Sequence, residues 1–373
     1  MGYILLLGVL FLNIRYSFGS KNIKIVIYLS LIIMLIFIAY NTDNADLMNY
    51  QYHFDEYKTG IELVKRPEIL YQIYLFCGAK LLNTYTDFLM FTGFAIVTLF
   101  YWIIKKIWGI ANVHNFLWLF FLYPLFPNIV QIRSFIGCLI FCMFFIGYWK
   151  KNSKIFFLFG ILLAGTFHIS FLFFAPFVLL LDLDDRKQLK RLFYFYTLMA
   201  SIAIIFCFWS PTYLIHLAGD FIQRFGGYHY AYMLEEASNQ IRWYARLIYV
   251  LILVTENFFS YVIFTRIRQR EKRSSFTFRA VKSCMLLNFY SGLFMPMIFV
   301  TSQAERVFRY VFVVNAIMLS IYMKLKTDQD KKFNLLLEVV LALVVFWCFV
   351  FSSSETFNNG FRAVLENNIL WQQ

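Results

Sequence analysis

Charge is scarce in this chain of 373 residues, of which 15% are Asp, Glu, Lys or Arg, whereas soluble domains carry about 25%. Hydrophobic residues make up 61% of the chain and aromatic residues 21%. This composition excludes a large soluble domain, because so much apolar surface requires lipid. The apolar runs approach the roughly 20 residues that a helix needs to cross a membrane. Helices satisfy their own backbone hydrogen bonds there, so we predict an all-α, polytopic integral membrane protein.

Cysteine motifs and internal repeats are also missing, and no cleavable signal peptide is evident. The six cysteines lie in apolar segments without a CxxC pair, so they indicate neither a disulfide framework nor a zinc site. The first apolar run, from Tyr3, has no basic region before it and no clear cleavage site, so we expect a retained helix. No repeat, low-complexity linker or soluble segment is visible, which predicts one transmembrane domain over residues 1–373.

The apolar runs predict about 11–12 membrane-embedded helices. The segments expected to span the membrane are 2–14, 24–40, 86–104, 112–126, 127–148, 155–181, 191–209, 243–265, 281–299, 307–323 and 334–351. Segment 67–82 is shorter and more polar than these, which is typical of a re-entrant or interfacial helix.

The net charge of +13 is compatible with nucleic-acid binding, but its distribution is not. The basic residues lie in short clusters between apolar runs, as membrane-flanking anchors do, so we expect no nucleic-acid partner. The clusters are Arg15/Lys21/Lys24, Lys105/Lys106, Lys150/Lys151/Lys154, Arg186/Lys187/Lys190/Arg191, Arg266 through Lys282, and Lys324/Lys326/Lys331/Lys332. The positive-inside rule places all of these clusters in the cytoplasm.

The clusters share one side only if segment 155–181 enters and leaves the membrane on the same side. This segment has 27 residues, which is longer than a single span needs. We therefore predict a hairpin of two half-helices that meet near Gly165–Thr166–Phe167–His168, with His168 at the outer tip. The alternative is one long tilted helix with His168 buried in mid-membrane. On the hairpin topology the outer face receives the acidic loop 41–68 and the loop 210–242, whose length makes it a candidate lid.

Ionisable residues inside membrane helices are costly, so each is a candidate functional residue. Arg133 falls about two turns into the predicted span 127–148, where it either binds an anion or extends to the lipid headgroups. His168 is either a general base for a sugar hydroxyl at neutral pH or a hydrogen-bonded packing residue.

Arginines near the ends of two further helices suit phosphate oxygens. Arg306 and Arg309 share one helix face at the outer lip, where planar guanidinium groups can bind a diphosphate bidentately. Anchoring to anionic lipid headgroups is the alternative. Arg242 and Arg246 flank Trp243 and Tyr244, and an ordinary interfacial belt explains that pair as well.

The first outer loop combines carboxylates with aromatic and amide side chains between Asp43 and His53. Such mixtures suit sugars, whose hydroxyls form hydrogen bonds and whose CH faces stack on rings. Glu68 follows Pro67 at a helix start, where it is either a functional acid or a simple first-turn acid. The triplet Asp182/Asp184/Asp185 lies in a charged cytoplasmic segment and is interpreted as a solvated loop, so no metal site is predicted.

These elements, in this order, resemble those of the EpsG/Wzy-type polysaccharide polymerases, which build O-antigen, capsule or exopolysaccharide by joining lipid-linked sugar repeats. The matching elements are the acidic loop with Asp43, Asp46 and Tyr50, the pair Glu68 and Tyr71, the pair Asn128 and Arg133, the pair Phe167 and His168, and the late arginines Arg306 and Arg309. The first loop lacks the Gly-x-Asp of many relatives, so Asp43 and Asp46 stay alternatives for one role.

The resemblance implies a GT-C-like fold and a glycosyltransferase that needs neither metal nor cofactor. Its expected reaction is the polymerisation of undecaprenyl-diphosphate-linked repeat units at the outer face of the bacterial inner or plasma membrane. Expected partners are these lipid-linked oligosaccharides, membrane lipids and a chain-length regulator. The implied catalytic residue is His168 as acceptor-side base, with Asp46 and Glu68 as alternatives. The implied ligand-binding residues are Arg133, Arg306 and Arg309 for diphosphate, and Asp43, Tyr50, Tyr71 and Arg242 for sugar.

Two other functions compete with this interpretation. A flippase of lipid-linked oligosaccharide would also use intramembrane arginines, although it should carry them through both leaflets. A membrane acyltransferase that modifies surface glycans would need a histidine beside a carboxylate, for which His53 with Asp55 and Glu56 is the candidate. A ligase that transfers finished glycan shares the chemistry of a polymerase, and the sequence does not separate the two.

Overall fold

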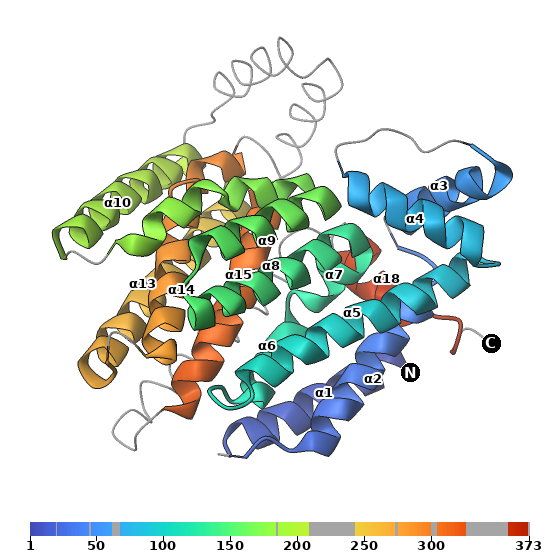
Figure 1. Ribbon diagram of the computed structural model, residues 1–373, viewed down its shortest axis with the longest axis horizontal. Coiled ribbons are helices and arrows are strands. Elements are labelled where there is room, and N and C mark those ends of the chain that lie inside the picture. Colours follow the sequence, from blue (N-terminus) through green and yellow to red (C-terminus); the bar gives the residue numbers. More distant parts are fainter. Residues whose placement is uncertain are drawn as a thin grey trace, which may run out of the picture. The chain divides into compact units, whose positions relative to one another are not determined.

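The computed structural model describes residues 1–19, 21–44, 46–61, 68–183, 186–208, 243–272, 275–299, 304–325 and 357–371. Within these ranges the regular elements are helices (Figure 1). The only strand-like contact there is an isolated bridge between Asn41 and Asn368. The predicted loop 210–242 and the predicted span 334–351 lie outside the described residues.

Five of the described helices are long and apolar enough to cross a membrane. They are Tyr85–Ile107, Ile132–Lys151, Lys187–Phe206, Val250–Arg270 and Val307–Lys324. Shorter apolar helices accompany them, among them Gly2–Ser17, Lys24–Ala39 and Lys154–Phe167. The prediction of an all-α, polytopic membrane protein is confirmed.

The chain forms two compact units, which we describe separately. The first comprises Met1–Val178 and Ala316–Gln373, and the second Leu179–Asn315. The elements that begin in the first unit are α1 Gly2–Ser17, α2 Lys24–Ala39, α3 Leu47–Thr59, α4 Ile69–Leu81, α5 Tyr85–Ile107, α6 Val113–Leu122, α7 Leu125–Val130, α8 Ile132–Lys151, α9 Lys154–Phe167, the 3-10 helices η1 Ile169–Phe174 and η2 Pro176–Asp182, the π-helix η5 Phe357–Arg362 and α18 Ala363–Glu366.

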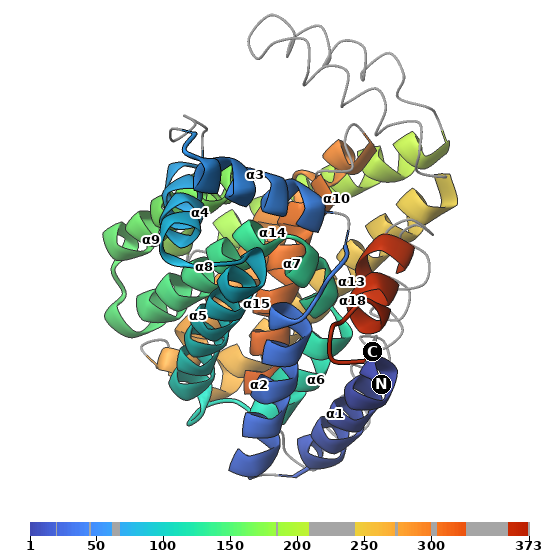
Figure 2. The same ribbon diagram turned by 90° about the vertical axis from the view of Figure 1, so that its right-hand side faces the viewer.

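A polar cluster joins three helices of the first unit. The Asn13 side chain of α1 donates a hydrogen bond to Ser30 Oγ of α2 at 2.8 Å, and its Oδ1 lies 2.9 Å from His114 Nδ1 of α6. His114 Nε2 in turn accepts from the backbone N–H of Ile23 at 2.9 Å. Because buried polar groups are costly without partners, this network favours one register of α1, α2 and α6. Helix α5 packs between α2 and α8 (Figure 2).

The predicted outer loop 41–68 contains a helix, α3, which the prediction missed. Tyr50, Phe54 and Tyr57 fall on one helical face, and all three are buried, as the i, i+4, i+7 pattern of an amphipathic helix requires. Helix α3 packs on α4, where the Tyr57 hydroxyl donates to Gln72 Oε1 at 2.7 Å.

The predicted spans 112–126 and 127–148 have different boundaries in the structure. Tyr123 is extended, with φ −164° and ψ 131°, because a residue before proline is disfavoured from the helical region. The short helix α7 follows, and Gln131, with φ −107° and ψ 68°, separates it from α8. Arg133 therefore lies in the first turn of α8, so the prediction that it sits two turns into a span is wrong.

The helix break predicted near His168 is confirmed, and the alternative of one continuous tilted helix is wrong. Helix α9 ends at Phe167, and His168 is extended, with φ −150° and ψ 117°. The chain continues as the 3-10 helices η1 and η2 rather than as a second α-helix. A Cβ atom on Gly165 would lie 2.4 Å from Leu172 Cδ2, so this glycine lets η1 pack closely on α9. Emergence of both ends on one membrane face stays a prediction.

The second unit is built on α10 Arg186–Phe208, α13 Trp243–Arg270, α14 Phe276–Gly292 and the 3-10 helix η3 Met295–Phe299. Helix α15 Ala304–Lys324 begins in this unit and ends in the first. Helices α10, α13 and α14 pack pairwise against one another. The buried side chains Asn288 of α14 and Asn315 of α15 exchange two amide hydrogen bonds of 2.6 and 2.9 Å, and Asn315 also donates to Glu256 of α13 at 3.0 Å.

Candidate active site

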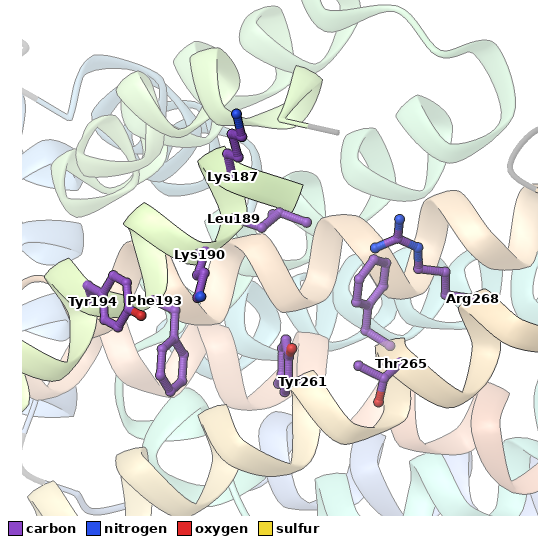
Figure 3. Close-up of a pocket in the computed structure, with 9 residues that line it drawn as sticks. Lys187, Leu189, Lys190, Phe193, Tyr194, Tyr261, Thr265 and Arg268 are labelled. Carbon is purple, nitrogen blue, oxygen red and sulfur yellow. The ribbon is translucent and has the colours of Figure 1, made fainter. Parts of the chain in front are cut away.

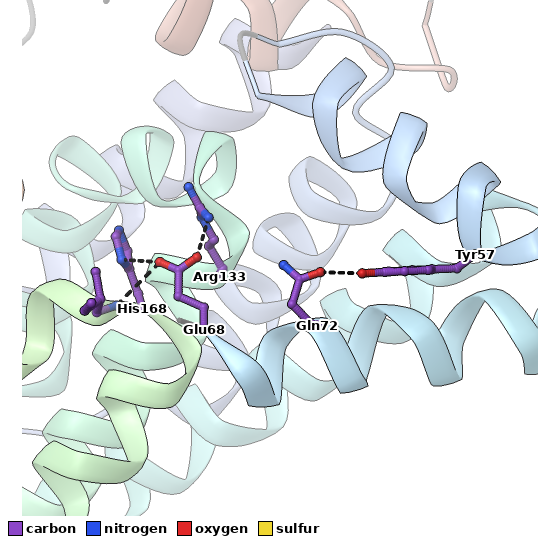
Figure 4. A network of polar contacts seen from close by, with 6 residues as sticks. Tyr57, Glu68, Gln72, Arg133 and His168 are labelled. Atoms are coloured by element: carbon purple, nitrogen blue, oxygen red, sulfur yellow. Dashed lines mark hydrogen bonds and ion pairs between the residues drawn. The ribbon is translucent and has the colours of Figure 1, made fainter. Parts of the chain in front are cut away.

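Glu68, in the first unit, contacts both His168, at the predicted hairpin, and Arg133 of α8 (Figure 4). Glu68 is the N-cap residue of α4, but its carboxylate makes no capping hydrogen bond with that helix. Instead, Oε2 accepts a hydrogen bond from Arg133 Nη1 at 2.5 Å, and Oε1 lies 2.9 Å from His168 Nδ1. The backbone N–H of Ile169 also points at Oε1, at 3.5 Å. The interpretation of Glu68 as a simple first-turn acid is therefore wrong.

The three side chains differ in their access to solvent. The exposed fraction is 9% for the Glu68 side chain, 6% for His168 and 28% for Arg133. Burial by itself raises the pKa of Glu68, but the hydrogen bond from His168 and the charge of Arg133 together hold that pKa below its ordinary value. Glu68 is thus ionised at neutral pH, and Arg133 is the member of the group most accessible to a ligand.

Arg133 occupies an unfavourable position that its neighbours stabilise. A cation in the first turn of a helix meets the positive end of the helix dipole. The Glu68 carboxylate offsets this, and the guanidinium lies 6.0 Å from the centre of the Tyr50 ring, within range of a cation–π interaction. Tyr50 contacts Tyr71 edge-on at 5.7 Å, and both tyrosines are buried. The local pair Glu68 and Tyr71 is thereby brought together with Tyr50 and Arg133, which lie farther away in the sequence.

The arrangement suits proton transfer beside an anion. A carboxylate that accepts from Nδ1–H fixes the tautomer of a neutral imidazole in which Nε2 carries the lone pair. It also stabilises the imidazolium that forms when Nε2 takes a proton. The guanidinium on the other carboxylate oxygen supplies a permanent positive charge in a partly buried environment, where charges interact more strongly than in water.

The remaining predicted site residues lie in several places. Asp46 is the N-cap residue of α3 and lies near enough to interact electrostatically with Arg133. Asp43 accepts a hydrogen bond from Asn367 Nδ2 at 3.3 Å in an exposed position. Arg309 is buried in α15 in the second unit, and Arg306 lies on the same helix. Arg242 lies outside the described residues.

Gln72 and Tyr57 are polar neighbours of the site that the sequence interpretation did not include. Gln72 lies one helical turn after Glu68 on α4 and is 3% exposed, and Figure 4 shows it on the same side of that helix as Glu68. The sequence feature that could have identified Gln72 is its spacing of four residues from Glu68, which places both on one helix face. The pairing of Glu68 with His168 had no such signal, because it joins residues separated by the whole of α4, α5, α6, α7, α8 and α9.

The fold and the site together define a polytopic all-α membrane protein in which a buried carboxylate contacts both a buried imidazole and a partly exposed guanidinium. A family model described as the EpsG family matches residues 24–362. The chain belongs to the EpsG family, which confirms the resemblance and indicates a polysaccharide polymerase-type role in a membrane. Neither the comparison with curated proteins nor the comparison with solved structures gave a match. The assignment of a GT-C-like fold therefore stays a prediction.

Proposed function

We propose that this protein is a membrane glycosyltransferase that polymerises undecaprenyl-diphosphate-linked oligosaccharide repeats at the outer face of the bacterial inner or plasma membrane. The observation that carries the proposal is the contact of one carboxylate, Glu68, with both His168 and Arg133, at 2.9 and 2.5 Å. A base and a cation beside each other suit a reaction in which a hydroxyl loses a proton while a diphosphate leaves. Membership of the EpsG family supports the same class of reaction.

In the proposed step, a hydroxyl of one lipid-linked repeat attacks the anomeric carbon of the growing chain on a second lipid diphosphate. A new C–O bond forms, and the bond between the anomeric carbon and the diphosphate oxygen breaks. The hydroxyl proton goes to His168 Nε2, and the electron pair of the broken bond leaves with the diphosphate. Glu68 holds His168 through Nδ1 and stabilises the imidazolium.

Arg133 is proposed to offset the charge that develops on the departing diphosphate. A guanidinium binds phosphate oxygens through two parallel N–H bonds and remains charged at all relevant pH values. Such a cation can neutralise a leaving group as a metal ion does in other enzymes, so the proposal includes no metal. Arg306 and Arg309 remain proposed diphosphate-binding residues, and Asp43, Tyr50, Tyr71 and Arg242 remain proposed sugar-binding residues. No step above depends on these residues.

The test is reconstitution of the purified full chain in vesicles with synthetic undecaprenyl-diphosphate oligosaccharide, followed by gel analysis of the products. The wild-type protein should give a ladder, and EDTA should leave it unchanged. His168→Gln should reduce the product by about 100-fold or more, the usual contribution of a general base. The matched control is His53→Gln, because His53 also pairs with a glutamate, Glu56, at 2.8 Å, but lies in α3. This control should retain the ladder.

Each other outcome supports a different function. Transfer of labelled lipid across the bilayer without product would support the flippase. Loss of acyl transfer to a glycan in His53→Gln, with His168→Gln unaffected, would support the acyltransferase. A single transfer to a different acceptor, without a ladder, would support the ligase. An unchanged ladder in His168→Gln would show that His168 is not the base, and a ladder that requires added Mg²⁺ would show that the reaction is not metal-independent.

A further inference from the structure

A groove lies between α10 and α13 in the second unit, where the N-terminal end of α10 meets the C-terminal end of α13 (Figure 3). Its volume is about 730 Å³, within the range of roughly 300 to 1,000 Å³ that is usual for small-molecule sites. The groove is separate from the residues used in the proposed glycosyl transfer, so nothing about it depends on that proposal.

Three cations line the groove. Lys187 and Lys190 come from the first turns of α10, and Arg268 comes from the last turn of α13 (Figure 3). None of the lining residues is acidic. The N-terminal end of α10 adds the positive end of its helix dipole to these charges. The groove is therefore a site of positive potential that favours an anion.

Aromatic side chains form most of the remaining lining, and several of them are exposed. Phe193 is 42% exposed and Tyr261 is 41% exposed, and the buried Phe264 lies between Tyr261 and Arg268 on α13. In a soluble protein, such exposure beside a cavity would be unusual. Here the rings make part of the groove lining apolar, next to its cations.

Helix α10 continues this apolar surface beyond the groove. In the most apolar 18-residue stretch within 187–206 of α10, 17% of the residues are buried, compared with 50% in the corresponding stretch within 250–270 of α13. Phe195, Leu198 and Ile205 are among its exposed side chains, at 56%, 51% and 54%. A ligand with its charge in the groove can therefore lay a long apolar tail along α10. Free phosphate and an acidic peptide both lack such a tail.

We propose that this groove binds an anionic phospholipid, with the headgroup between the basic ends of α10 and α13 and an acyl chain along α10. Basic pockets between transmembrane helices on the cytoplasmic side are a known kind of site for such headgroups. The positive-inside rule places both basic clusters on that side. In this proposal the second unit binds one kind of headgroup specifically, in addition to the nonspecific contacts that its helices make with the bilayer.

The experiment is native mass spectrometry of the full chain in detergent, titrated with three probes. These are phosphatidylglycerol, phosphatidylcholine with the same acyl chains, and soluble glycerol phosphate. Phosphatidylglycerol should bind at least tenfold more tightly than phosphatidylcholine, and glycerol phosphate should not displace it at equal concentration. Replacement of Lys187, Lys190 and Arg268 together by Gln should weaken phosphatidylglycerol binding roughly 100-fold, because each cation contributes about 1 kcal/mol.

The matched control replaces Lys105 and Lys106 by Gln. Lys106 also lies over an aromatic ring, that of Trp102, at 4.6 Å, and belongs to a basic cluster at the end of another span, but neither lysine lines the groove. The control should bind phosphatidylglycerol as the wild type does. If the triple variant unfolds, Arg268→Gln alone should weaken binding about fivefold.

Four results would overturn the proposal. Equal affinity for the two lipids would show that the headgroup is not recognised. Displacement by glycerol phosphate at equal concentration would show a site for free phosphate esters. Equal weakening in the groove variant and the Lys105/Lys106 control would show that basic clusters attract the lipid without a defined site. Preferential binding of an acidic peptide such as oligoglutamate would assign the groove to a protein partner instead.

Discussion

At the scale of single residues, Glu68 contacts both other ionisable members of the candidate site, so its removal affects two residues at once. The two partners contact different oxygens of the Glu68 carboxylate. His168 is held on the Oε1 side and Arg133 on the Oε2 side. Each partner can therefore be altered while the other keeps its contact, which makes the proposed division of roles measurable.

The pKa of Glu68 predicts an acid-sensitive contribution to stability. Glu68 lies before α4, outside the five long spans, and its pKa is held below the ordinary value of 4.5. The unfolded chain therefore binds this proton first, so the contribution is fully present above pH 4.5 and is lost as the pH falls through the lower, folded value. Thermal unfolding measured from pH 7 to pH 3 should show a steeper loss for wild type than for Glu68→Gln. Parallel curves would contradict the coupling.

Arg133→Lys tests whether the shape of the cation matters as well as its charge. Lysine keeps the positive charge beside Glu68 but cannot bind phosphate oxygens through a planar fork. We expect polymer formation to fall at least about tenfold while thermal stability changes little, because the ion pair with Glu68 can re-form. The readout is the product ladder together with the unfolding temperature. A full ladder in this variant would show that bidentate binding is not required.

At the scale of elements, the chain break after α9 positions His168. Gly137 of α8 lies against Phe171 of η1, and a Cβ there would be 2.6 Å from Phe171 Cε2 and 3.3 Å from the Ala164 carbonyl oxygen. Phe171 is fully buried and its ring centre is 6.5 Å from that of His168. Displacement of Phe171 therefore also shifts the neighbouring His168 imidazole.

Gly137→Ala should lower the free energy of unfolding by about 1–3 kcal/mol, the usual cost of overpacking. Polymer formation should fall further than the amount of folded protein, because His168 shifts relative to Glu68. The matched control is Gly8→Ala in α1, where no heavy atom lies within 4 Å of the new Cβ. That change should stabilise the helix by about 0.5–1 kcal/mol. Equal behaviour of the two variants would contradict the packing argument.

The buried amide pair of the second unit supports a further prediction. Asn315→Leu removes the partner of both Glu256 and Asn288, and each buried polar group left without a partner costs about 1–3 kcal/mol. We expect destabilisation of roughly 2–5 kcal/mol in SDS-induced unfolding. Thr255→Val, next to Glu256, removes only a hydrogen bond to the Leu251 carbonyl and should cost about 0.5 kcal/mol or less. A similar cost for both would show that the network does not stabilise the unit.

Elements were predictable where neighbouring residues in the sequence gave a clear pattern. They were missed where polar residues obscured that pattern or where the contact joins residues far apart in the sequence. The break at His168 followed from the length of one apolar segment and the charge on both sides. Helix α3 was missed because its polar residues obscured the aromatic spacing of Tyr50, Phe54 and Tyr57. The contact of Glu68 with His168 depends on how six intervening helices pack, and no spacing in one chain carries that information.

At the scale of the whole molecule, the proposed function depends on which face of the membrane the site meets. The hairpin topology places residues 154 and 182 in the cytoplasm, beside the basic clusters at 150–154 and 186–191, and places residue 170 near the outer face. Single cysteines at Lys154, Ser170 and Asp182 test this with a membrane-impermeant maleimide. All six native cysteines must first become serine, because Cys77 is an exposed free thiol and any remaining native thiol adds background labelling.

In spheroplasts, the cysteine at position 170 should react, whereas those at 154 and 182 should react only after the membrane is permeabilised. The result bears on function because His168 lies two residues before position 170. A lipid-linked repeat is polymerised where its sugar is presented, so an outward His168 is required for the proposed reaction. If positions 154 and 182 label from opposite sides, segment 155–181 crosses the membrane. One of the basic clusters would then face outward, and His168 would lie within the bilayer, away from the proposed acceptor.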